Sequence, residues 1–201
     1  WIADTTRLKK DQGVFNAPTS FQSPIANNAD SDIQLLMLGA DHMHADDLRG
    51  QGMLVAILDN GYTGVDKFSP FQDVWENNRI LATKDFVGNA ENVFQYGSHG
   101  TSVFSIIGAK FDTDTSSYSG IAYEADFILC ITEDDEAENR VEEYNWLLGA
   151  EFADSLGADV INASLGYNTF DIEEHDYDPD ELDGKTAIVS IAANLAARKG
   201  M

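Results

Sequence analysis

The chain of 201 residues is 43% hydrophobic and carries 12 Lys or Arg against 35 Asp or Glu, a formal net charge of −23. This length and apolar content suffice for the core of one α/β domain, and the negative field repels nucleic-acid phosphates and anionic lipid, so we expect no nucleic-acid partner and no membrane partner. The single cysteine, Cys130, excludes an internal disulfide and a cysteine-based metal cluster.

The first 35 residues are polar and irregular, which predicts a linker or extended N-terminal arm over residues 1–35 and a domain over residues 36–201. One or two short helices are expected before the glycine-rich turn near residues 50–52. Because the chain begins with Trp1 and shows no signal peptide, we expect its ends to reflect processing or cleavage.

The strand signals come as short apolar runs. Continuous hydrophobicity over residues 53–59, 125–132 and 158–166 is typical of strands buried on both faces of a parallel sheet, and residues 80–86 are a fourth expected strand. Residues 132–138 and 171–183 are expected as acidic loops.

Three helices are expected between and after these strands, over residues 99–109, 137–157 and 184–200. The residues expected to face the core are Val103, Ile106 and Ile107 in the first helix, Val141, Tyr144, Leu148, Phe152, Leu156 or their neighbours in the second, and Ile188, Ile191, Ala192 and Leu195 in the third. Alternating strands and helices predict an α/β fold with a doubly wound, mostly parallel sheet. The next element would be another strand, so the sheet is expected to be incomplete in this chain.

Asp59 ends the first expected strand before the turn Asn60-Gly61, and His99 begins the first long helix. Taken singly, the aspartate fits a turn residue and the histidine fits a capping or surface residue. Taken together they indicate chemistry, because residues at the carboxyl ends of parallel strands gather at one edge. A carboxylate that accepts a hydrogen bond from one imidazole nitrogen leaves the other nitrogen free as a general base.

Four ordered blocks of the sequence resemble one family. They read GQGMLVAILDNG, GSHGTSVFSIIGA, SGIAYEADFILC and GADVINASLG, and in order and spacing they resemble the subtilisin-like serine proteases, the subtilase family (peptidase S8). The resemblance covers about residues 48–201 and looks most like subtilases of the Bacteroidetes type, many of which are secreted.

The resemblance implies a role for each matching residue. Asp59 would orient the base, His99 would be the general base and acid, and Ser164, Leu165 and Gly166 would bind an extended peptide substrate. The nucleophilic serine and the oxyanion-hole asparagine would lie beyond residue 201, so this chain alone is expected to be inactive. Ser102 would be a helix residue and not the nucleophile. Asn60 departs from the Ser, Thr or Ala that many subtilases carry after the aspartate.

The same resemblance implies a polypeptide substrate, the remainder of the same protease as partner, and a secreted or cell-surface location. No cofactor would be required. Structural calcium is possible, and the loops at 111–120 and 132–138 offer oxygen ligands, but neither has an assignable pattern, so the metal ligands stay unknown.

Two other functions remain open from the sequence. One is a catalytically inactive subtilase-like module that binds peptides or a protein partner. The other, a nucleotide-binding domain, is disfavoured because the turn DNGYTGVD lacks the glycine spacing of a phosphate loop.

Overall fold

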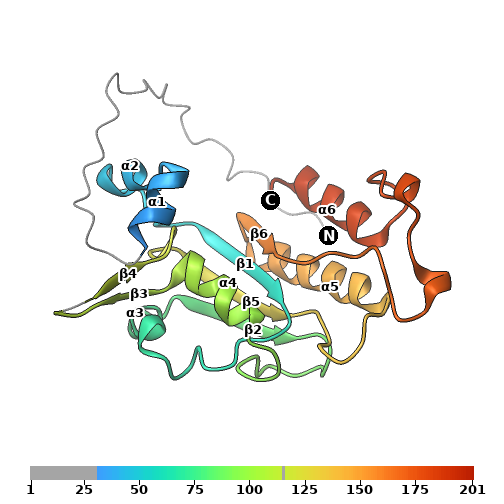
Figure 1. Cartoon of the computed structure of the whole chain (residues 1–201), viewed down its shortest axis with the longest axis horizontal. Helices are drawn as coiled ribbons and strands as arrows, with labels where there is room; N and C mark the ends of the chain where they lie inside the picture. Colours follow the sequence, from blue (N-terminus) through green and yellow to red (C-terminus); the bar gives the residue numbers. More distant parts are fainter. Residues whose placement is uncertain (1–30, 115) are drawn as a thin grey trace, which may run out of the picture.

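The computed structural model describes residues 31–114 and 116–201 (Figure 1). The N-terminal arm expected over residues 1–35 falls almost wholly outside this part of the chain and stays a prediction. The described chain opens with two short helices, α1 (Asp32–Leu38) and α2 (Ala40–Ala45). Gly39 separates them with a left-handed φ of 69°, a conformation that glycine adopts without steric cost.

Four parallel strands form the main sheet. They are β1 (Leu54–Asp59), β2 (Ile80–Asp85), β5 (Asp126–Ile131) and β6 (Val160–Ala163), in the order β2-β5-β1-β6. The register pairs Asp59 with Ile131 and Leu58 with Ala163. All four strands expected from the sequence are therefore confirmed, and their carboxyl ends share one edge.

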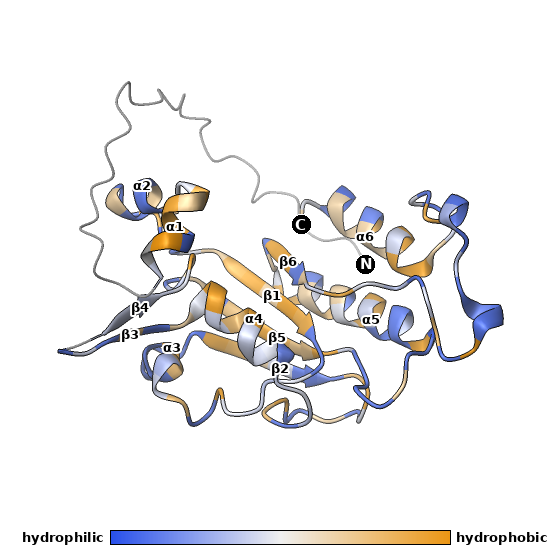
Figure 2. Ribbon diagram, viewed as in Figure 1, coloured by the Kyte–Doolittle hydropathy of each residue, from blue (hydrophilic) through white to orange (hydrophobic). Residues whose placement is uncertain are grey.

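Helices cover both faces of this sheet, as expected for a doubly wound fold. On one face Ile57, Phe127 and Leu129 pack with Phe104 of α4 (His99–Gly108). On the other face Leu58 and Cys130 belong to the core that includes the buried residues of α5 (Val141–Leu156). The final helix, α6 (Ile188–Lys199), packs against α5. Figure 2 shows β1 and β5 as apolar strands between these layers.

The prediction that the last strand is buried was wrong. Residues 158–166 were expected as a buried strand, but only residues 160–163 are extended, and Val160 is 45% exposed. The reason is position: within the described part of the chain, β6 pairs with β1 alone and forms an edge of the sheet.

The helices form as expected, but they turn different faces to the core. Ile106 in α4, Tyr144 and Leu148 in α5, and Leu195 in α6 are exposed. The buried positions lie one or two residues away: Phe104 in α4, Trp146, Gly149, Ala150 and Ala153 in α5, and Ala192 and Ala196 in α6. Of the inward positions expected for α6, only Ala192 is confirmed as buried.

Smaller elements complete the described chain. A 3-10 turn (Ser69–Phe71) leads into helix α3 (Gln72–Glu76). Strands β3 (Lys110–Asp112) and β4 (Ser117–Ser119) form an antiparallel hairpin where the sequence indicated only a loop. The acidic stretch at 171–183 includes two further 3-10 turns, Glu173–His175 and Pro179–Glu181. Across the described residues, every helix is too short or too polar to cross a bilayer.

Candidate active site

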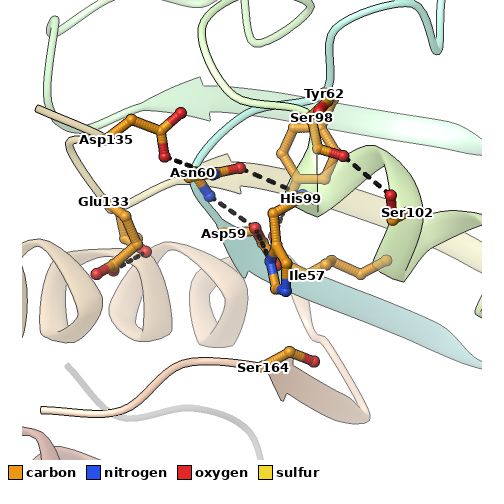
Figure 3. Close-up of polar contacts among 12 residues, drawn as sticks. Ile57, Asp59, Asn60, Tyr62, Ser98, His99, Ser102, Glu133, Asp135 and Ser164 are labelled. Carbon is orange, nitrogen blue, oxygen red and sulfur yellow. Dashed lines mark hydrogen bonds and ion pairs between the residues drawn. The ribbon is translucent and has the colours of Figure 1, made fainter.

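Strand β1 and helix α4 bring Asp59 and His99 together at the carboxyl edge of the sheet. Asp59 is the last residue of β1, and His99 is the first residue of α4. His99 Nδ1 lies 2.8 Å from Asp59 Oδ1, across 40 positions of sequence (Figure 3). The expected pairing of these two side chains is therefore present.

Asp59 is fully buried. Its Oδ1 accepts hydrogen bonds from His99 and from the backbone N–H of Asn60, at 2.8 Å each, while Oδ2 has no partner among the described residues. Burial raises the pKa of the Asp59 carboxyl, and the bonds from Asn60 and His99 oppose that rise. A buried carboxylate is costly without such donors, so the imidazole and this backbone group are what keep it ionised.

The imidazole of His99 is half exposed, at 51% of its side-chain surface. Donation of the Nδ1 hydrogen to Asp59 fixes the tautomer and leaves the Nε2 lone pair free to take a proton. A buried carboxylate behind a solvent-facing imidazole is an arrangement suited to general base catalysis.

The approach of α4 to β1 depends on Gly100. A Cβ atom at this position would lie 2.5 Å from the carbonyl oxygen of Gly61 and 2.9 Å from the Cβ of Asp59. Contacts this short with backbone cannot be relieved by a rotamer change. Glycine after His99 therefore permits the close approach of α4 to the end of β1.

The predicted peptide-binding segment lies at the same edge. Ser164, Leu165 and Gly166 follow directly after β6, whose Ala163 pairs with Leu58, so Ser164 is beside the end of β1 (Figure 3). Ser164 and Gly166 are exposed and Leu165 is half-buried. A hollow of about 440 Å³ adjoins this segment, and the residues that line it include Trp146, Leu165, Ala187 and Val189.

Ser102 lies in the first turns of α4, as expected. Its hydroxyl donates to the backbone oxygen of Ser98 at 3.2 Å, and Figure 3 shows the two residues together on the helix. The side chain is thus engaged with its own helix.

Three polar contacts near the pair were not foreseen from the sequence. The Asn60 side chain bonds both Gly100 and Asp135, and Glu133 accepts a hydrogen bond from the Tyr167 hydroxyl at 2.5 Å. The one signal in the sequence was the unusual Asn60. Nothing in the residue types alone pairs Glu133 with Tyr167.

The acidic loops do not assemble into a cluster for a metal ion. Over residues 31–114 and 116–201, no group of three or more His, Cys, Asp or Glu side chains is placed to hold one. Structural calcium, with its ligands unknown, stays an untested prediction.

A sequence model of the subtilase family matches residues 50–200. No curated protein matches the sequence.

Several solved structures share the fold. MycP1 with its N-terminal propeptide removed matches at 24% identity and a TM-score of 0.58, over 87% of this chain and 48% of that one. MycP1 from Mycobacterium smegmatis matches at 22% identity and a TM-score of 0.57, over 88% and 45%. The MycP3 protease from the type VII (ESX-3) secretion system matches at 20% identity and a TM-score of 0.60, over 90% and 46%. The chain thus spans about half the length of these neighbours.

Proposed function

The chain belongs to the subtilase family, and from that membership we propose that it supplies the aspartate and histidine of an Asp-His-Ser triad in a serine endopeptidase. The observation that carries the proposal is the 2.8 Å contact between His99 Nδ1 and the buried Asp59. The nucleophilic serine and the oxyanion-hole asparagine would come from beyond residue 201, so these residues alone would not hydrolyse peptides.

In the proposed mechanism His99 acts twice. Its Nε2 takes the proton of the serine hydroxyl as that oxygen attacks the peptide carbonyl, and then returns the proton to the leaving amine. Asp59 holds the tautomer and stabilises the imidazolium that forms between the two steps. Helix α4 is a rigid mount for the ring, because Phe104 anchors it in the core.

The proposed substrate is a polypeptide bound in extended form. Ser164, Leu165 and Gly166 would pair with its backbone, since they follow β6 directly at the edge that carries Asp59, and Ser164 and Gly166 are exposed. The hollow beside Leu165 would accept a substrate side chain, and its apolar lining favours an apolar one.

The location of action is also a proposal. A structural neighbour is described as a protease of a type VII secretion system, which supports a secreted or cell-surface role. No cofactor is needed for the proposed chemistry, and the likeness to Bacteroidetes enzymes stays a prediction.

The test uses the complete protease and a fluorophosphonate probe, which reacts with an activated serine. We expect the wild-type protein to gain the probe mass and to cleave peptides, and we expect His99→Ala to lose both properties while keeping its melting temperature. Asp59→Asn should lower kcat by about 10³- to 10⁴-fold through the wrong imidazole tautomer.

The matched control is His175→Ala, which removes a histidine from the loop at 171–183 and should leave labelling unchanged. A folded wild-type protein that stays unlabelled would support the alternative, an inactive subtilase-like module that binds peptides or a partner. Near-normal turnover in the His99→Ala protein would contradict the proposed serine-protease function.

A further inference from the structure

Asn60 joins the strand, the helix and the acidic loop that meet around the Asp59–His99 pair. Its Oδ1 accepts a hydrogen bond from the backbone N–H of Gly100 at 3.3 Å, and its Nδ2 donates to Asp135 Oδ1 at 2.5 Å. Its backbone N–H donates to Asp59 Oδ1, the same oxygen that contacts His99. Figure 3 shows the Asn60 amide between the helix start and the loop after β5.

The contact with Gly100 completes the start of helix α4. The N-cap residue of this helix, Ser98, makes no side-chain capping bond. A capping oxygen normally accepts from the second or third N–H of the helix, and Gly100 is the second helical residue. Asn60 therefore caps α4 from the turn after strand β1, in place of the local serine.

The segment that leads into the helix is shaped around this amide. The backbone oxygen of Asn60 accepts from the N–H of Gly97 at 3.4 Å. A Cβ atom on Gly97 would lie 2.3 Å from Cγ of Asn60, so the turn packs directly on the side chain. Gly97 and Gly100, on either side of His99, are thus both held by Asn60, the residue that follows β1.

Asp135 fixes which way the amide points. Gly100 offers a hydrogen and needs an acceptor, whereas the Asp135 carboxylate is an acceptor and needs a donor. Only one orientation of the Asn60 amide satisfies both. The loop at 132–138 thereby locks the capping oxygen toward the helix.

We propose that Asn60 is a positioning residue: by capping α4 from the turn after β1, it holds the His99 imidazole in line between Asp59 and the attacking serine. The inference rests on the proposed protease function. It adds to that function a residue outside the Asp-His-Ser triad that acts through His99 without touching the substrate.

The experiment compares Asn60→Ala with Asn77→Ala in the complete protease. Asn77 is a control because it makes side-chain hydrogen bonds to Asp73 on α3, outside this site. We expect Asn60→Ala to lower kcat by about 10- to 100-fold with KM nearly unchanged, since a small displacement of a catalytic group costs rate rather than binding. Amide exchange of Gly100 should speed up in Asn60→Ala and stay at the wild-type rate in Asn77→Ala.

Exchanging the side chains of Asn60 and Asp135 tests whether Asn60 acts through its hydrogen bonds or only through its volume. Asn60→Asp alone keeps an acceptor for Gly100 but faces Asp135 with a second carboxylate, so kcat should fall. Adding Asp135→Asn restores a donor to the contact between residues 60 and 135, and the double variant has the same net charge as the wild-type protein. Its kcat should return most of the way to the wild-type value. Failure of this double variant to recover activity in a folded protein would contradict the capping geometry.

The remaining outcomes are distinguishable. A wild-type protein that labels with fluorophosphonate alongside an Asn60→Ala protein of equal kcat overturns the positioning role and leaves the protease assignment intact. If amide exchange of Gly100 is faster in Asn60→Ala but kcat is unchanged, Asn60 stabilises the helix start without positioning His99, and the proposal is wrong. An unlabelled wild-type protein overturns the protease function, and the positioning role falls with it.

Discussion

Glu133 lies two residues after strand β5, at the same edge of the sheet as Asp59, and its carboxyl has a raised pKa. Its Oε1 accepts hydrogen bonds from the hydroxyls of Tyr167 at 2.5 Å and Thr132 at 2.7 Å. Burial raises the pKa of Glu133 to about 7, although both hydroxyl bonds act to lower it. Burial and the Glu133 charge also raise the pKa of the Tyr167 hydroxyl, so the tyrosine stays a donor. The bond joins the loop after β5 to the segment after Ser164.

This raised pKa predicts a pH-dependent stability. The folded state keeps the proton of Glu133 up to pH about 7, whereas the unfolded chain loses it near the ordinary glutamate value of 4.5. The free energy of unfolding should therefore fall as pH rises from about 4.5 to about 7, by roughly 3 kcal/mol from this residue. In Glu133→Gln this part of the fall should vanish, which urea unfolding of the complete protease at pH 5 and pH 8 measures. An identical pH dependence in the two proteins would contradict the assignment.

Gly100 gives a second prediction at the scale of one residue. Gly100→Ala places a methyl group against Gly61 and Asp59 and should destabilise the fold by about 1–3 kcal/mol. It should also lower kcat, because relief of the clash moves α4 away from β1. Gly166→Ala is the matched control for stability, since a Cβ there meets nothing within 4 Å. Thermal melts of both variants check the contrast, and equal melting temperatures would count against the close approach.

The contact between Asp59 and His99 could be predicted from the sequence, but its surroundings could not. Asp59 and His99 stand out because an ionisable side chain at the end of an apolar strand or at the start of a helix is unusual and needs a partner. Asn60 and Glu133 gave no comparable signal, because their partners Asp135 and Tyr167 lie 75 and 34 positions away. Such contacts are decided by the tertiary fold.

At the scale of elements, the apolar pattern of the sequence predicted the strands and the helices correctly, but it predicted the wrong buried face for the helices. A buried strand needs apolar residues on both faces, so its composition alone reveals it. Helix α5 instead packs through Trp146 and a set of small residues, and a Cβ on Gly149 would lie 3.0 Å from the Leu58 side chain. The large apolar residues Tyr144 and Leu148 then fall on the exposed side. Size governs which face can approach the sheet closely, and hydropathy does not report it.

Helix α4 offers a direct test of which face is buried. Phe104 is fully buried, with ring centroids 5.1 Å from Phe71 and 4.8 Å from Phe127, whereas Ile106 is 61% exposed. Phe104→Ala should cost about 3–5 kcal/mol through the lost contacts and the cavity. Ile106→Ala on the same helix should cost under about 0.5 kcal/mol. Urea unfolding of the two variants ranks them, and a larger loss for Ile106→Ala would refute the observed packing.

At the scale of the whole molecule, negative charge dominates the field around the proposed active site. The described structure places an acidic loop directly after β5, with Asp135 in contact with Asn60 beside the Asp59–His99 pair. The chain as a whole, this loop included, carries a formal net charge of −23. A field of this sign concentrates cations near the cleft and raises their association rate.

This field predicts that salt affects substrates according to their charge. For a peptide with lysines on either side of the cleaved bond, kcat/KM should fall several-fold as ionic strength rises from about 20 to about 200 mM, because screening shortens the reach of the acidic loop. The same peptide with glutamines in place of the lysines should show a nearly constant kcat/KM, which controls for any effect of salt on the fold.

Replacing Asp134 and Glu136 with Asn and Gln removes two charges of the loop and leaves Asp135 and Glu133 in place. This variant should flatten the salt dependence for the cationic peptide alone. Equal salt dependence for both peptides would show that the loop charge does not steer the substrate, and the field would then bear only on solubility.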